Sequence, residues 1–105
     1  MNMLKVPVYR NKKLLALAKE APHCMRCRQP NVGQVVAAHA NMQTMGKGTG
    51  LKAADIPAYL CHSCHDALDG RINCGMGTRE MHAEWAIAAV LSLRWALENH
   101  PEVFR

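Results

Sequence analysis

Aromatic residues are scarce in this sequence: its 105 residues include one Phe, two Tyr and two Trp. With so few aromatic rings, a hydrophobic core must rely on Leu, Val, Ile, Met and Ala. The length leaves room for one compact domain, spanning residues 1–105. A domain of this size can fold unaided, but a bound metal ion would stabilise it considerably.

Long apolar runs are also missing. No apolar stretch of signal-peptide length follows Met1, and none elsewhere is long enough to span a membrane. We therefore expect a cytoplasmic protein with no membrane partner. Disulfides are rare in the cytoplasm, so paired cysteines in such a protein indicate a metal or redox site.

Acidic residues are outnumbered by basic ones, with 8 Asp and Glu against 13 Lys and Arg and a formal net charge of +5. This moderate basic excess suits a polyanionic partner without requiring one. The glycine-rich segment 46–50 does not match the GxxxxGK[ST] pattern, which argues against a nucleotide-binding phosphate loop.

Helix-forming residues dominate two segments near the ends of the chain. Asn11 can cap a helix over residues 11–20. The longer helix covers residues 79–98, with Thr78 as its cap and Pro101 beyond its end. Apolar side chains cover more of this C-terminal helix than one buried face requires, so a homodimer through it is one expectation.

The middle of the chain predicts a hairpin and a short helix. Residues 29–33 are rich in turn formers, and the β-branched run 34–39 follows as the second strand of a hairpin, with His39 at its end. A short helix is expected over residues 61–69, ending at Gly70.

Two CxxC pairs, Cys24–Cys27 and Cys61–Cys64, give the strongest local signal. A two-residue spacer lets both sulfurs of a pair reach the same tetrahedral ion at about 2.3 Å. A dithiol redox site normally belongs to a βαβ unit, which this sequence does not predict. The four cysteines therefore predict one structural Zn²⁺ ion. Four protein ligands leave no position for water or substrate, so the zinc explains folding and not activity.

A second candidate site combines His39, His65 and Asp69. His65 directly follows Cys64, and Asp69 lies four residues later on the same helix face. An imidazole and a carboxylate on one face suit a divalent cation, while a histidine outside the metal shell can accept a proton from water. The residue types alone are equally compatible with histidines that only contact thiolates or solvent.

The order of these parts resembles the HNH, or ββα-metal, endonuclease superfamily, and is most similar to the small nucleases of lambdoid phages and prophages. The resemblance covers residues 22–71 and rests on a CxxC…H…CxxCH skeleton, with stretches 48–52 and 64–71 most similar. The resemblance implies a small α+β fold. Its zinc-stapled ββα-metal core would be flanked by an N-terminal helix and a long C-terminal helix.

The resemblance also implies a function and residue roles. The protein would be a metal-dependent DNA endonuclease, hydrolysing phosphodiester bonds in phage or prophage recombination or DNA processing. His39 would be the general base, and Asp55 would orient it. His65 and Asp69 would bind a catalytic Mg²⁺ or Mn²⁺ ion.

One departure from the family pattern concerns the residue before the base. Many members carry Asp or His there as a metal ligand, whereas this sequence has Ala38. The metal shell is therefore one ligand short unless Asn41, Asp55 or Asp66 supplies it.

Basic residues near the proposed site predict contacts to the DNA backbone that depend little on sequence. The strongest candidates are Lys47, Lys52 and Arg71, and Lys12, Lys13, Arg26 and Arg28 lie in neighbouring segments. Two other readings stay open. One is a non-catalytic zinc-knuckle module that binds nucleic acid or a protein. The other is an interaction protein that assembles through its C-terminal helix.

Overall fold

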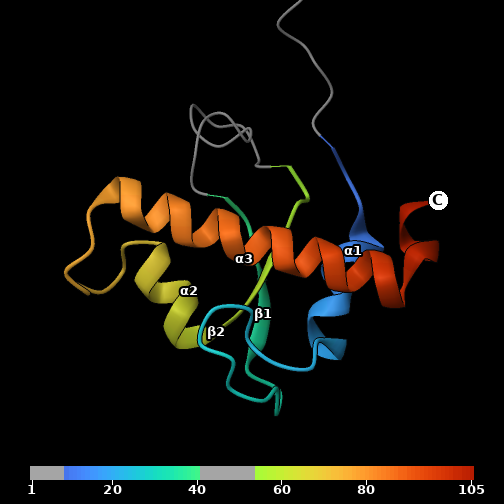
Figure 1. The fold of residues 1–105 in the computed structure, drawn as a ribbon, viewed down its shortest axis with the longest axis horizontal. Coiled ribbons are helices and arrows are strands. Elements are labelled where there is room, and N and C mark those ends of the chain that lie inside the picture. The colour runs from blue at the N-terminus through green and yellow to red at the C-terminus, as the bar shows by residue number, and fades with distance from the viewer. Residues whose placement is uncertain (1–8, 41–53) are drawn as a thin grey trace, which may run out of the picture.

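The computed structural model describes residues 9–40 and 54–105. Figure 1 shows one long helix crossing the molecule, with a two-stranded sheet and the shorter helices packed along one side of it. This arrangement is small and α+β, as expected. In chain order the elements are α1 (Lys12–Ala16), the 3-10 helix η1 (Leu17–Glu20), β1 (Val35–Ala38), β2 (Ala58–Cys61), α2 (His62–Leu68), α3 (Thr78–Asn99) and the 3-10 helix η3 (Pro101–Phe104).

The N-terminal helical segment begins as its sequence indicates. The Asn11 side chain accepts a hydrogen bond from the Leu14 amide at 3.0 Å, which satisfies a donor that the first helical turn leaves free. The α-helix is shorter than the expected range of residues 11–20, because its second half tightens into η1. The chain becomes extended at Ala21, directly before Pro22, as the restriction on residues preceding proline requires.

The sheet differs from the expected hairpin. β1 pairs with β2 in antiparallel register, from Val35 opposite Cys61 to Ala38 opposite Ala58. The segment before residues 29–33 contributes one isolated bridge, because it forms the tight turn that carries the first cysteine pair. The second strand, β2, was not expected from sequence, since Pro57 directly precedes it and its four residues show no alternation.

The two later helices match their sequence signals closely. α2 ends before Gly70, whose φ of 78° is the left-handed conformation that glycine adopts readily after a helix. α3 starts at Thr78, so Gly77 takes the cap position that the sequence analysis gave to Thr78, and no side chain caps the helix there. The helix ends at Asn99, two residues before Pro101.

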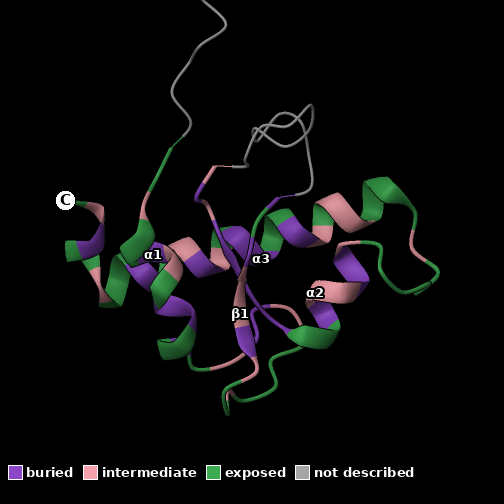
Figure 2. Cartoon of the chain, turned by 180° about the vertical axis from the view of Figure 1, so that it is seen from behind, coloured by how far each residue is buried: buried purple, intermediate pink, exposed green. Residues whose placement is uncertain are grey.

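The core lies where β2 packs against α3 (Figure 2). Tyr59 is fully buried, and its hydroxyl donates to the Leu14 carbonyl at 2.5 Å. Its amide donates to the buried Ser92 hydroxyl at 2.9 Å, which in turn donates to the Ala88 carbonyl. Among the described residues, every buried side-chain nitrogen and oxygen atom has a hydrogen-bond partner, which avoids the cost of an unpaired polar group. These bonds connect β2 with α1 and α3.

The opposite side of α3 leaves several apolar side chains in solvent. Ile87, Val90 and Leu97 are each more than half exposed, which agrees with the excess of apolar residues noted in the sequence. A dimer through this surface stays a prediction. None of the described helices combines the length and apolar character needed to cross a membrane.

Candidate functional site

Cys24, Cys27, Cys61 and Cys64 lie together. The first pair sits in the turn before β1, Cys61 ends β2 and Cys64 lies in the first turn of α2. Their four sulfur atoms lie within 4.8 Å of one another, and the Sγ atoms of Cys27 and Cys61 are 3.8 Å apart. A tetrahedral ion with Zn–S bonds of about 2.3 Å places its sulfurs about 3.8 Å apart. The donor set and its spacing therefore fit zinc, and the site is closed.

Backbone amides prepare one of these sulfurs for metal binding. The amides of Arg26 and Cys27 donate to Cys24 Sγ at 3.4 and 3.5 Å. Burial raises the pKa of Cys24, but the amides of Cys27, Cys61 and Arg26 outweigh it and lower the pKa to about 6. These amides therefore favour the thiolate form of Cys24, which is the form that binds a metal ion.

Cys64 shows why the cluster needs a cation. Burial raises its pKa to about 12, against which the Arg26 guanidinium acts by donating a hydrogen bond to Sγ at 3.5 Å. Four thiolates confined to this space repel one another. A divalent cation would remove that repulsion, so binding of such an ion would be coupled to ionisation of the cysteines.

Arg26 also connects the cysteine cluster to α3. Its Nε donates to Glu84 Oε1 at 2.9 Å, while another nitrogen of the same guanidinium contacts Cys64. The pair is partly exposed, with 29% of the Arg26 side chain and 38% of the Glu84 side chain accessible. One side chain therefore joins the turn of the first cysteine pair to both later helices.

His39 directly follows β1 and is held by a buried carboxylate. Its Nε2 lies 3.2 Å from Oδ1 of Asp55. An ionised carboxylate only accepts hydrogen bonds. Nε2 of His39 therefore carries the proton and donates a hydrogen bond to Asp55. In the neutral ring this leaves Nδ1 as the proton acceptor.

Asp55 is kept ionised by several donors. Burial raises its pKa, but the Asn11 amide at 2.9 Å and the His39 ring outweigh this effect, and the nearby Arg10 guanidinium lowers the pKa further. The net result is a pKa below the ordinary value of an aspartate. Arg10 Nη1 lies 3.3 Å from the same oxygen that His39 contacts.

α3 helps to hold the end of β1. The Trp85 indole is buried and donates to the Ala38 carbonyl at 3.0 Å. Ala38 is the residue directly before His39, so this bond fixes the backbone that carries the histidine.

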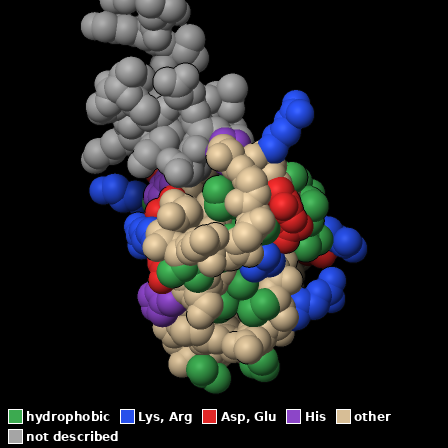
Figure 3. Space-filling model, turned by 90° about the vertical axis from the view of Figure 1, so that its left-hand side faces the viewer, with side chains coloured by type: hydrophobic (Ala, Val, Ile, Leu, Met, Phe, Trp, Pro, Cys, Tyr) green, Lys and Arg blue, Asp and Glu red, His purple; other side chains and the backbone are tan. Residues whose placement is uncertain are grey.

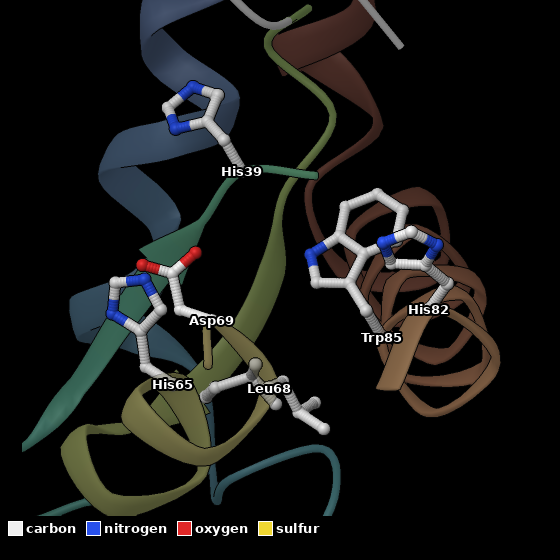
Figure 4. A pocket seen from close by; sticks show the side chains of 7 residues that line it. His39, His65, Leu68, Asp69, His82 and Trp85 are labelled. Atoms are coloured by element: carbon white, nitrogen blue, oxygen red, sulfur yellow. The ribbon is translucent and has the colours of Figure 1, made fainter. Parts of the chain in front are cut away.

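His65 lies in the middle of α2 and Asp69 directly follows the helix, and Figure 4 shows their side chains near each other. They line one small pocket together with His39 from the end of β1 and His82 and Trp85 from α3. The free space in this pocket is about 10 Å³, on the scale of one water molecule or ion. The pocket thus brings together three of the four residues predicted for catalysis, and the fourth, Asp55, contacts it through His39.

Arg71, which was predicted to contact DNA, forms ion pairs with two carboxylates of the protein. Its Nε lies 3.1 Å from Asp69 Oδ2, and Nη1 lies 3.3 Å from Asp66 Oδ1. The cation therefore balances two carboxylates of the α2 segment. It also occupies one oxygen of the predicted metal ligand Asp69.

A third ligand for the His65–Asp69 pair is not found nearby. Among residues 9–40 and 54–105, the four cysteines are the one group of three or more His, Cys, Asp or Glu side chains with closely placed ligand atoms. Asp55 is occupied by His39, and Asp66 by Arg71. The remaining candidate, Asn41, lies outside the described residues, as do the predicted DNA contacts Lys47 and Lys52.

His82 is the pocket residue that sequence reasoning missed. No motif in the sequence includes it, but it lines the pocket together with Trp85 (Figure 4). One sequence signal was present: His82 lies three residues before Trp85 within a segment of strong helix formers, which places the two on the same face of the helix.

Charges near α2 and the start of α3 are mixed in sign. Figure 3 shows this end of the molecule, where the Lys and Arg side chains of the described residues are spread around the rim among Asp, Glu and His and form no single basic patch.

No family model, curated protein or solved structure matches the chain.

Proposed function

We propose that this protein is a metal-dependent endonuclease of the HNH, ββα-metal type, acting on DNA. The observation that carries the proposal is the pocket itself. His39, with Nε2 held by Asp55 and Nδ1 left as a proton acceptor, lines the same small space as His65 and Asp69. A base beside a pair of metal ligands is the arrangement that hydrolysis of a phosphodiester requires.

The order of the elements supports the same proposal. An antiparallel pair of strands is followed directly by a helix, the base lies after the first strand, and His65 lies on the helix. This is the ββα order that the family name describes. The cysteine cluster lies at the junction of β2 and α2, so a bound zinc ion would fix the helix that carries His65.

The residues then have distinct tasks in the reaction. His39 accepts a proton from a water molecule at Nδ1, and Asp55 stabilises the resulting imidazolium through Nε2–H. The water oxygen forms a bond to phosphorus, and the bond from phosphorus to the leaving oxygen of the DNA strand breaks. His65 and Asp69 would hold a Mg²⁺ or Mn²⁺ ion, which supplies charge stabilisation for the phosphate and the leaving oxygen.

Arg71 gains a role in this proposal. If Asp69 turns to a metal ion, its ion pair with Arg71 weakens, and the guanidinium becomes available to a DNA phosphate. Such contacts to the backbone would bind DNA with little sequence preference.

One observation favours a second candidate, a non-catalytic zinc module that binds nucleic acid or a protein. Ala38 cannot ligate a metal, and the described residues bring no third ligand to His65 and Asp69. This candidate predicts binding without turnover.

The deciding experiment is cleavage of supercoiled plasmid and branched DNA with added Mg²⁺ or Mn²⁺. We expect the wild type to nick DNA and His39→Ala to lose at least about 100-fold in rate, the usual contribution of a general base. His62→Ala is the matched control. His62 is an exposed histidine in the same CxxCH motif as His65, but it does not line the pocket. Zinc content and melting temperature must stay unchanged in both variants. Cleavage by His39→Ala at the wild-type rate would remove His39 from the mechanism, and no cleavage by any folded protein would favour the binding module.

A further inference from the structure

A second concave surface lies away from the histidine pocket, between the start of α1 and the end of the chain. It is an open cleft with about 420 Å³ of space, much larger than the histidine pocket. Its lining includes four basic and two aromatic side chains: Arg10, Lys12, Lys13, Arg105, Tyr9 and Phe104.

Hydrogen bonds hold the walls of this cleft in place. The Asn11 side-chain amide donates to the Val103 carbonyl at 2.8 Å and to the Tyr9 hydroxyl at 2.9 Å. The Asp55 amide donates to the Tyr9 carbonyl at 2.8 Å. The cleft therefore spans segments more than 90 residues apart in sequence that are joined by direct bonds, and a ligand would not have to order them.

The side chains of the cleft suit a polyanion that also carries flat rings. No side chain that lines it is acidic, and Lys12 and Lys13 are both exposed to solvent. Arg10 is paired with Asp55, so Lys12 and Lys13 are the basic side chains best placed to meet an anionic ligand. Tyr9 is 45% exposed, and Phe104 is partly exposed. Lysines that neutralise phosphates, together with aromatic rings that stack on bases, characterise single-strand binding surfaces.

The cleft is connected to the proposed base through one carboxylate. Arg10 Nη1 and His39 Nε2 lie 3.3 and 3.2 Å from the same oxygen of Asp55. The two nitrogens can be no further apart than these distances combined, a span no longer than two base-pair rises of duplex DNA at about 3.4 Å each. A strand that reaches Arg10 is therefore close to His39.

We propose that the cleft lined by Tyr9, Arg10, Lys12, Lys13 and Phe104 binds a single strand of nucleic acid and leads it to His39. Lys12 and Lys13 contact phosphates, and a base stacks on Tyr9 or Phe104. This inference rests on the proposed function for its direction toward His39, but the binding site itself does not depend on cleavage.

The test measures fluorescence anisotropy of a labelled oligothymidylate with zinc-loaded His39→Ala protein and no added Mg²⁺ or Mn²⁺. We expect Lys12→Gln/Lys13→Gln to weaken binding and to reduce the salt slope by about 1.4, at about 0.7 for each lost phosphate contact. Tyr9→Ala is expected to weaken binding by about 10-fold through the loss of stacking. The matched control is Lys19→Gln/Arg79→Gln, two exposed cations outside the cleft.

The outcomes separate this inference from the proposed function. Equal affinity of the cleft variants and the control would overturn the cleft as a binding site, whether or not the wild type cleaves DNA. Loss of affinity confined to the cleft variants would support it even if no cleavage were found. Affinity for duplex equal to that for the single strand, or displacement of the oligonucleotide by polyglutamate at equal charge, would overturn the single-strand specificity.

Discussion

The cysteine cluster and the histidine pocket share helix α2 but are built in different ways. Cys61 and Cys64 lie at the start of the helix, in a closed set of four identical ligands from two short motifs. His65 and Asp69 face a small pocket that is also lined by His39, which follows β1, and by residues of β2 and α3. Within each CxxC motif the spacing alone brings two sulfurs together, and the pairing of β1 with β2 then brings the two motifs together. A site made of distant elements depends on packing, so its geometry is more easily lost.

The largest expected effect comes from removing the metal from the cysteine cluster. Cys64→Ser, or a chelator added to the wild type, should abolish the cooperative folding transition measured by circular dichroism. Structural zinc sites in small domains contribute about 10–16 kcal/mol at neutral pH, more than the usual stability of such a domain. Cys74→Ser is the matched control, because Cys74 is exposed and lies outside the cluster. A Cys64→Ser protein that melts like the wild type would contradict the structural role of the cluster.

A smaller effect is expected where α3 holds the end of β1. Trp85→Phe leaves the buried Ala38 carbonyl without its indole donor, at a cost of about 1–3 kcal/mol in the free energy of unfolding. Zinc content should not change. The cleavage rate should fall by a larger factor than the fraction of folded protein, because the backbone next to His39 is no longer held by Trp85.

The control for this variant is Trp95→Phe. Trp95 packs edge-on against Tyr59, and phenylalanine keeps a ring at that position. Urea unfolding and cleavage rates on both variants would measure the difference. Equal loss of cleavage in the two would show that the Trp85–Ala38 bond does not position the base.

Glu84→Gln tests the connection between the cysteine cluster and α3. It removes the charge that pairs with Arg26 while keeping the side-chain shape. Both partners are about one-third exposed, so solvent screens the pair and the expected loss is about 0.5–1 kcal/mol. Glu98→Gln, which alters the exposed pair of Arg94 and Glu98 within α3, should cost less. Denaturant titration at low and high salt would detect the difference, and equal values for both variants would argue against a special role for Arg26.

The smallest effect concerns pH and the carboxylate beside His39. The folded pKa of Asp55 is lowered, so its ionised form stabilises the protein above the unfolded pKa, about 3.9, and this stability is lost as the pH falls through the lower folded value. Asp55→Asn should therefore narrow the small difference in unfolding free energy between pH 6 and about pH 5, measured at equal zinc content because acid also releases zinc from cysteines. Asp66→Asn, at a more exposed carboxylate, is the control. An unchanged pH dependence in Asp55→Asn would show that this group is not linked to folding.

Sequence alone predicted the elements that depend on near neighbours. The CxxC pairs, the Asn11 cap and the stop at Gly70 each act within a few residues, and all appear in the structure. α3 was predicted within one residue at each end, since strong helix formers fill it. The four cysteines predicted to bind one metal ion do lie together in the structure.

The features that sequence did not predict depend on contacts between distant segments. β2 is a short strand that pairs with β1, although about 20 residues of sequence separate the two strands. The donors to Asp55 come from residues 10, 11 and 39, and His82 reaches the pocket only because α3 packs beside α2. No local sequence pattern predicts these contacts between distant segments. The role of each histidine is therefore a matter of packing rather than of motif.

The most direct test of the division between the two sites is a titration of cleavage with Mn²⁺ in protein that already holds one zinc ion. We expect the rate to rise and saturate with Mn²⁺ while the zinc content stays at one per chain. Asp69→Ala should shift the curve to higher Mn²⁺, whereas Asp66→Ala should shift it less. Cleavage that needs no added Mn²⁺, or an identical curve for Asp69→Ala, would contradict the assignment of the chemistry to the histidine pocket.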